Sequence, residues 1–196
     1  MKKIIPKDSI LIPDQAKKVF DGVIFEVYQW NQKLYDGTSA VFEMLKRPDT
    51  AVAIAVVNNK IVLLEDEQPN RGPLFSNPCG RVELTDNSIL DAAKRETLEE
   101  TGYTFKNWRL VTVKQIARKI EWFVHVYVAW GVEDEAPTKH DAGEKISLEL
   151  IDFDKYKELA SKGEGGLEDC KEILEVVSSI EELKNQPEFK GLAVDR

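Results

Sequence analysis

The sequence of 196 residues predicts an α/β fold, preceded by a small antiparallel β region. Three segments indicate this class. Residues 51–57 form an uninterrupted apolar run rich in valine, as in a strand buried on both faces. Residues 89–101 lie between Ser88 and Gly102, the residue types that commonly cap a helix. Residues 121–130 partly alternate apolar side chains, which predicts another strand.

The N-terminal β region is predicted from two segments. Residues 18–30 alternate in part, and residues 39–46 follow a turn signal at 35–37, so both are expected to be strands. The following segment changes in composition to a continuous apolar run. We therefore divide the chain into an N-terminal β region, residues 1–48, and a second domain, residues 49–196.

The rest of the second domain mixes strands and helices. Polar, turn-rich stretches at 65–77 and 133–145 are expected to be loops. The expected strands are 61–64, 108–116 and 146–151, and the expected helices are 154–161 and 167–184. Strands interspersed with helices are typical of a sheet covered by helices.

Composition excludes several classes of protein. With 42% hydrophobic and 32% charged residues and no apolar stretch near the roughly 20 residues of a membrane span, no membrane partner is expected. A net charge of -8 disfavours nucleic acid as a partner. Pro6 and Asp8 interrupt any signal-peptide core, and Cys79 and Cys170 are far apart in the sequence. We expect a cytoplasmic protein with reduced thiols.

A cluster of acids on the predicted helix carries the chemical interpretation. Glu96, Glu99 and Glu100 share one face beside Arg95, because residues three and four apart are neighbours on a helix. Carboxylate oxygens suit magnesium, or manganese as the alternative, and such an ion can bridge them to phosphate oxygens. The same spacing also describes a solvated acidic face.

The segment from Gly80 to Gly102 resembles the Nudix box: Gly, five residues, Glu, seven residues, then Arg-Glu-apolar-x-Glu-Glu-x-Gly-apolar. The matching positions in its second half are Arg95, Glu96, Glu99, Glu100 and Gly102. The preceding strands and the Pro78-Cys79-Gly80 segment resemble the branch of ADP-ribose and nucleoside diphosphate-sugar pyrophosphatases. This resemblance implies an α/β/α sandwich with a mixed sheet.

The first half of the box carries one inserted residue. Counting back from Arg95 places Arg81, instead of Gly80, at the leading glycine position. The motif glutamate is then replaced by Asp86, counted from Gly80, or by Asn87, counted from the helix. Asp86 could pair with Arg95 through the longer loop.

The resemblance implies a role for each matching residue. The implied metal ligands are the carbonyl of Cys79 and the carboxylates of Glu96, Glu99 and Glu100. The implied catalytic residues are Glu99, Glu100, Arg95 as the group that orients the ligands, and Glu144 as general base, with Asp141 and Glu135 as alternatives. Taken individually, each of these loop acids fits a solvated surface charge better than a general base.

Substrate-binding residues are predicted from position and chemistry. Arg71 is a candidate because Glu67-Gln68-Pro69-Asn70 replaces the arginines common in this branch, and Arg81 could hold a phosphate or pair with Glu83. Tyr28 and Trp30 could stack on a base. The resemblance also implies a homodimer formed through the N-terminal strands.

We expect magnesium-dependent hydrolysis of a pyrophosphate bond in a nucleoside diphosphate-linked compound, such as ADP-ribose or a nucleotide sugar. The partner is then a small-molecule nucleotide. The alternative is a non-catalytic Nudix-like domain that binds or senses a nucleotide, because the first half of the box is altered. An interaction module whose acidic helix meets a basic partner is a third hypothesis.

Overall fold

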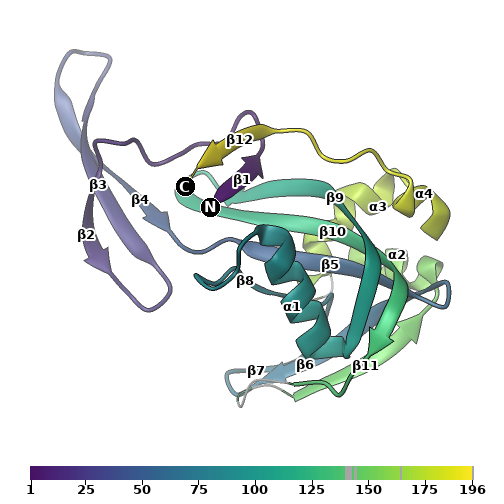
Figure 1. The fold of residues 1–196 in the computed structure, drawn as a ribbon. Coiled ribbons are helices and arrows are strands. Elements are labelled where there is room, and N and C mark those ends of the chain that lie inside the picture. Colours follow the sequence, from purple (N-terminus) through teal and green to yellow (C-terminus); the bar gives the residue numbers. More distant parts are fainter. Residues whose placement is uncertain (140–142, 144, 164, 196) are drawn as a thin grey trace.

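The computed structural model describes residues 1–139, 143, 145–163 and 165–195. Its centre is a curled mixed sheet with helices on both sides, so the predicted α/β/α arrangement is confirmed (Figure 1). The strands are β1 (Lys2–Ile5), β2 (Lys17–Asp21), β3 (Glu26–Lys33), β4 (Ser39–Lys46), β5 (Thr50–Val57), β6 (Lys60–Gln68), β7 (Arg71–Ser76), β8 (Cys79–Arg81), β9 (Tyr103–Ala117), β10 (Ile120–Glu135), β11 (Lys145–Ile151) and β12 (Leu192–Asp195). The helical elements are α1 (Ile89–Thr101), α2 (Phe153–Ser161), the 3-10 segment η1 (Gly165–Cys170), α3 (Lys171–Glu175) and α4 (Ile180–Lys184).

The main sheet runs in the order β11-β6-β5-β10-β4-β3-β2. In addition, β7 pairs with β6, β8 with β5, and β9 with β10. The sheet is mixed because β10 lies parallel to both β4 and β5, whereas its other neighbour, β9, is antiparallel. The buried strand β5 therefore lies beside both β10 and the short strand β8.

Both faces of β5 are buried, which explains its continuous apolar sequence. Val52, Ile54 and Val56 pack with the helices α2 to α4 on one face. Ala51 belongs to the cluster around α1 on the other face, where small side chains let the helix approach the sheet closely. The position of α1 relative to β5 and β8 is thus set by core packing.

The predicted boundaries of α1 are confirmed. The Ser88 hydroxyl accepts a hydrogen bond of 3.1 Å from the Asp91 amide, as an N-cap does. Gly102 has a φ of 76°, a left-handed conformation that glycine adopts without strain, and its amide donates to the Leu98 carbonyl. These caps fix where the acidic face of the helix begins and ends.

The N-terminal region divides into two parts. β1 pairs with β12, so the first strand lies against the last one, and Ile5 is buried in the core around α1. The strands β2 to β4 form a meander that projects from the body and joins the sheet only where the end of β4 pairs with β10 (Figure 1). The division at residue 48 stays a prediction.

Several elements differ from those expected from sequence. The stretch 65–77 is mostly the hairpin of β6 and β7, since its backbone pairs along most of its length. The expected helix at 167–184 is broken into η1, α3 and α4, and Ser179 caps the last of these. No helix in the described residues is both long and apolar enough to span a membrane.

Candidate functional site

Arg95 lies at the centre of the carboxylate cluster. Its Nε and Nη2 donate to the two carboxylate oxygens of Asp86 at 3.1 and 3.0 Å, and Nη2 also donates to the carbonyl oxygen of Arg81 at 3.0 Å. Such a two-point contact fixes the plane of the guanidinium. Between the two sequence alternatives, Asp86 is therefore the residue that holds Arg95, and the inserted residue is accommodated in the loop.

The side chain of Asp86 is only 6% exposed. It also accepts a hydrogen bond of 2.8 Å from the Glu83 amide, which closes the loop between β8 and α1. Hydrogen bonds from Arg95 lower the pKa of Asp86 and outweigh the effect of burial. Asp86 is consequently a charged anchor for Arg95.

The three glutamates gather around Arg95 and the strand β8. Arg95 Nη1 donates to Glu96 Oε1 at 2.7 Å and to Glu99 Oε2 at 3.2 Å. Glu100 Oε2 accepts a hydrogen bond of 2.9 Å from the amide of Cys79. The structure thus brings together Cys79, Arg95 and all three glutamates that the sequence predicts to be a site.

Gly80 leaves the space that Glu96 occupies. A Cβ atom on Gly80 would lie 2.0 Å from Cδ of Glu96 and 2.2 and 2.4 Å from its two carboxylate oxygens. No real side chain tolerates such distances. Glycine at this position therefore lets a carboxylate lie directly against the backbone of β8.

The donor chemistry of this cluster fits magnesium or manganese. Carboxylate oxygens beside a glycine that exposes the backbone are the hard ligands these ions prefer. In the described residues no three acids, histidines or cysteines are close enough together to form a ready-made cage. Two of the glutamates point at Arg95 instead, so binding an ion there requires rotation of their side chains.

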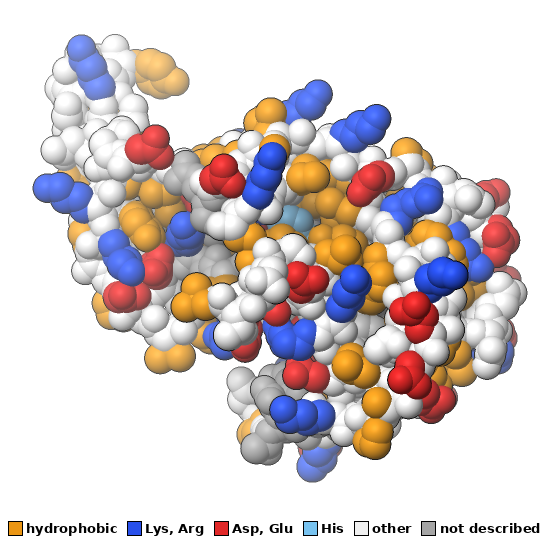
Figure 2. Space-filling model, in the orientation of Figure 1, with side chains coloured by type: hydrophobic (Ala, Val, Ile, Leu, Met, Phe, Trp, Pro, Cys, Tyr) orange, Lys and Arg blue, Asp and Glu red, His pale blue; other side chains and the backbone are white. Residues whose placement is uncertain are grey.

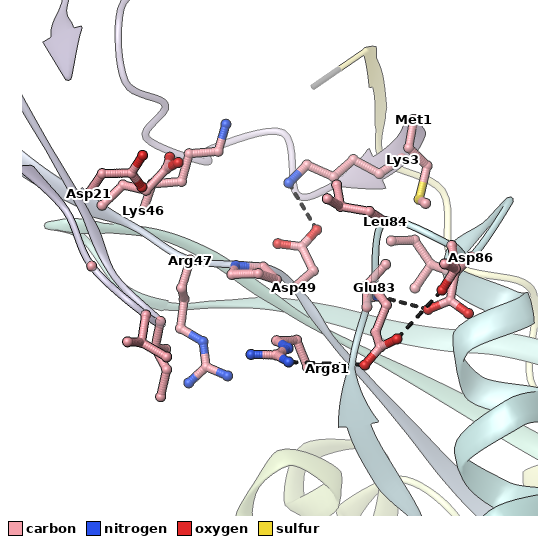
Figure 3. A pocket seen from close by; sticks show the side chains of 18 of the residues that line it. Met1, Lys3, Asp21, Lys46, Arg47, Asp49, Arg81, Glu83, Leu84 and Asp86 are labelled. Carbon is pink, nitrogen blue, oxygen red and sulfur yellow. Dashed lines mark hydrogen bonds and ion pairs between the residues drawn. The ribbon is translucent and has the colours of Figure 1, made fainter.

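A hollow of about 1040 Å³ lies beside this cluster, between the projecting strands and the loop that follows β8 (Figure 3). Tyr28, Arg81 and Asp86 line it, whereas Glu96, Glu99 and Glu100 do not. Its other charged lining residues are Lys3, Asp21, Glu26, Lys46, Arg47, Asp49 and Glu83. Asp86 therefore separates the hollow from the glutamates.

The remaining predicted site residues lie elsewhere. Arg71 pairs with Asp66 on the β6–β7 hairpin. Trp30 packs on Phe42 in the projecting meander, with ring centroids 6.0 Å apart, and does not line the hollow of its own chain. Glu135 is exposed at the end of β10. Glu144 and Asp141 fall outside the described residues.

Charged residues at the floor of the hollow were missed by sequence reasoning. Asp49 is 5% exposed and binds Lys3 at 2.9 Å, His125 at 3.3 Å and the Phe123 amide at 3.1 Å. Burial raises the pKa of Asp49, but His125 and Lys3 lower it by more. His125 is thus a buried, hydrogen-bonded structural residue. The sequence feature that could have indicated these residues is the presence of two charged side chains, Arg47 and Asp49, just before the buried strand β5.

Comparison with known proteins agrees with this geometry. The model of the NUDIX domain matches residues 46–170. The ADP-ribose pyrophosphatase of Bacillus subtilis (strain 168) is 27% identical over 116 residues, which are 58% of this chain and 62% of that protein. The match thus spans less than two thirds of the length of that relative.

A solved structure, described as a crystal structure of ADP compounds hydrolase, superposes with a TM-score of 0.61 at 18% identity. The superposition covers 81% of this chain and 85% of the other, and it shows a shared fold. The family match includes β5 to β11, the Arg95 cluster and the loop that carries Asp86. The chain belongs to the NUDIX domain family.

Proposed function

We propose that this protein hydrolyses the diphosphate linkage of a nucleoside diphosphate-linked compound in the presence of magnesium, with manganese as a substitute. ADP-ribose is the first candidate substrate and nucleotide sugars are the second. The observation that carries the proposal is the Arg95 cluster, in which one guanidinium orders Glu96 and Glu99 beside a glycine-exposed backbone. Membership of the family and similarity to an ADP-ribose pyrophosphatase support it.

In the proposed site, Glu96, Glu99, Glu100 and the carbonyl of Cys79 hold the metal. The ion, when bound, supplies positive charge that neutralises the diphosphate oxygens and favours attack by water. Arg95 keeps the glutamates in position through hydrogen bonds, which is a positioning role. Water adds to one phosphorus and the bridging P–O bond breaks, giving a nucleoside monophosphate and a phosphorylated second product.

The general base is proposed to be an acid at the end of β10 or in the segment that follows it. Glu144 is the first candidate, and Asp141 and Glu135 are the alternatives. The base accepts one proton from the attacking water, so it must lie within hydrogen-bond reach of that water.

Substrate contacts are proposed for four residues. Arg81 and Tyr28 line the hollow beside the cluster, which supports a role in binding the nucleotide. Arg71 would need to leave Asp66 before it could bind a phosphate. Trp30 would contact substrate only across a dimer, because it does not line the hollow of its own chain.

We propose a homodimer formed through residues 1–48, in the cytoplasm. The outer edge of β2 is the end of the sheet, and an uncovered strand edge invites pairing with another chain. Apolar side chains lie exposed on this projecting region (Figure 2), among them Val19, Phe20 and Val41 at 53%, 59% and 64% exposure. Both cysteines are unpaired, which is compatible with a reducing compartment.

Hydrolysis of a nucleotide panel with magnesium tests the proposal. Glu99→Gln and Glu100→Gln keep the shape of the side chain and remove its charge, so each should lower turnover at least tenfold. Glu175→Gln, an exposed position on α3, is the matched control and should not change it. If a nucleotide stabilises the protein against heat, but no nucleotide of the panel is cleaved with either metal, the binding-only alternative is favoured instead.

A further inference from the structure

Two arginines face the hollow without an acid between them. Arg47 comes from the end of β4 and Arg81 from the end of β8, and both point into the same part of the hollow (Figure 3). Their charges are close enough to act on each other: burial and then the charge of Arg81 lower the pKa of Arg47, and the charge of Asp49 opposes this only in part. Two like charges held together in this way favour an anion that would lie between them.

The guanidinium of Arg47 is held in place by an aromatic ring. Its Cζ lies 4.2 Å from the centre of the Trp122 ring, and the indole is itself fixed by a 3.1 Å hydrogen bond to the Thr50 hydroxyl. Nε of Arg47 is buried and makes no hydrogen bond in the described part of the protein. A buried donor without a partner costs free energy, whereas the stacking on Trp122 fixes where the guanidinium lies.

The acids of the hollow are already committed to other cations. Asp49 binds Lys3 and His125, Asp86 binds Arg95, and Asp21 and Glu26 bind Lys18. Glu83 is the acid nearest to Arg81, at the long distance of 4.0 Å. Lys46 is 3.5 Å from the buried Glu121. The charge of Arg47 is therefore offset only in part, by the nearby Asp49, and that of Arg81 only by the distant carboxylate of Glu83.

We propose that Arg47 and Arg81 form a subsite for an anionic group, a phosphate or a carboxylate, that a nucleotide carries in addition to its diphosphate. This inference rests on the proposed function, because it assumes that the diphosphate lies at Glu96, Glu99 and Glu100. Those glutamates line no part of the hollow, so the anion bound there is a second one. The protein would then prefer nucleotides with an additional phosphate or an acidic sugar over neutral counterparts.

Apolar side chains complete the subsite. Val23, Ile24 and Leu84 also line the hollow and leave room for a sugar or base next to the charged group. A phosphate or carboxylate can accept hydrogen bonds from the planar fork of each guanidinium.

Binding measured by calorimetry in EDTA tests the subsite without any dependence on hydrolysis. Inorganic phosphate should bind to the wild-type protein, and Arg81→Gln and Arg47→Lys should weaken it about tenfold through loss of charge-assisted hydrogen bonds. Arg118→Gln, which removes an exposed charge on the β9–β10 turn, is the matched control. Arg81 has a side chain 47% exposed, so its replacement should leave the fold intact.

Binding of two matched nucleotide pairs completes the experiment. The first pair is ADP-ribose and ADP-ribose 2′-phosphate, and the second is UDP-glucose and UDP-glucuronic acid. At least one anionic member should bind about tenfold more tightly than its partner, and Arg81→Gln should abolish the difference. Phosphate binding that is absent, or equal in all variants, would overturn the subsite, as would two pairs without any preference. A failure of the proposed function would show separately, as absence of product with magnesium.

Discussion

Replacing Asp86 by alanine is the sharpest perturbation of the Arg95 cluster. The change removes two hydrogen bonds from Arg95, at 3.0 and 3.1 Å, and one from the Glu83 amide at 2.8 Å. A hydrogen bond to a charged group contributes about 1.5–3 kcal/mol where both ends are shielded from water. Arg95 is 26% exposed and keeps Glu96 and Glu99 as acceptors, so we expect the free energy of unfolding to fall by about 2–3 kcal/mol in total.

The Asp86→Ala change should lower activity as well as stability. Without Asp86, Arg95 is free to move and no longer holds the glutamates in one arrangement. Groups that orient metal ligands typically affect activity by roughly 10- to 100-fold. Urea unfolding and initial rates of nucleotide hydrolysis measure the two effects. Asp8→Ala, at an exposed turn, is the matched control for loss of an acid and should change neither.

The pH dependence of the free energy of unfolding tests whether the charged form of Asp86 stabilises the folded protein. Because the pKa of Asp86 is lowered in the folded protein, its contribution is complete above the ordinary aspartate pKa of about 3.9 and is lost as the pH falls further. The difference in unfolding free energy between wild type and Asp86→Ala should therefore shrink below about pH 4. An Asp86→Ala protein that matches wild type in both stability and rate at pH 7 would refute the role given to this residue.

Three further predictions concern other parts of the protein. Gly80→Ala should leave the unfolding transition within about 1 kcal/mol, because the displaced group is the mobile end of Glu96, yet lower the hydrolysis rate at least tenfold; an unchanged rate would contradict it. Burial raises the pKa of Cys170 to about 12, so iodoacetamide should alkylate this thiol at pH 9 only after unfolding in urea, and rapid labelling of the folded protein would show the opposite. Phe20→Asp places a charge on the exposed meander and should shift the protein from dimer to monomer in analytical ultracentrifugation; a dimer that persists would contradict the proposed interface.

The sequence predicted the elements whose signal is local. The helix at 89–101 carries its own caps and acidic spacing, and residues 51–57 carry the apolar run of a strand buried on both faces. Long-range pairing has no such signal. The strand β1 pairs with β12 across nearly the whole chain, and β7 forms because its backbone pairs with β6, so neither was predicted.

The same distinction holds for the site. Arg95 and the glutamates lie on one helix, and their proximity follows from helical spacing alone. The partnership of Asp86 and Arg95 could be stated only as one of two alternatives, because an inserted residue obscures the count and only the loop conformation resolves it. Arg47 follows β4 and Arg81 ends β8, and these segments are separate in the sequence, so no pattern of spacing indicates that the two arginines share a hollow.

Manganese binding followed by electron paramagnetic resonance tests the central claim most directly, since free and bound ions give distinct signals. We expect the wild-type protein to bind manganese at micromolar to millimolar concentrations, and Glu96→Gln and Glu100→Gln to weaken this binding at least tenfold. Equal binding by all three proteins, or no binding by the wild type even with ADP-ribose present, would contradict the assignment of these glutamates as metal ligands.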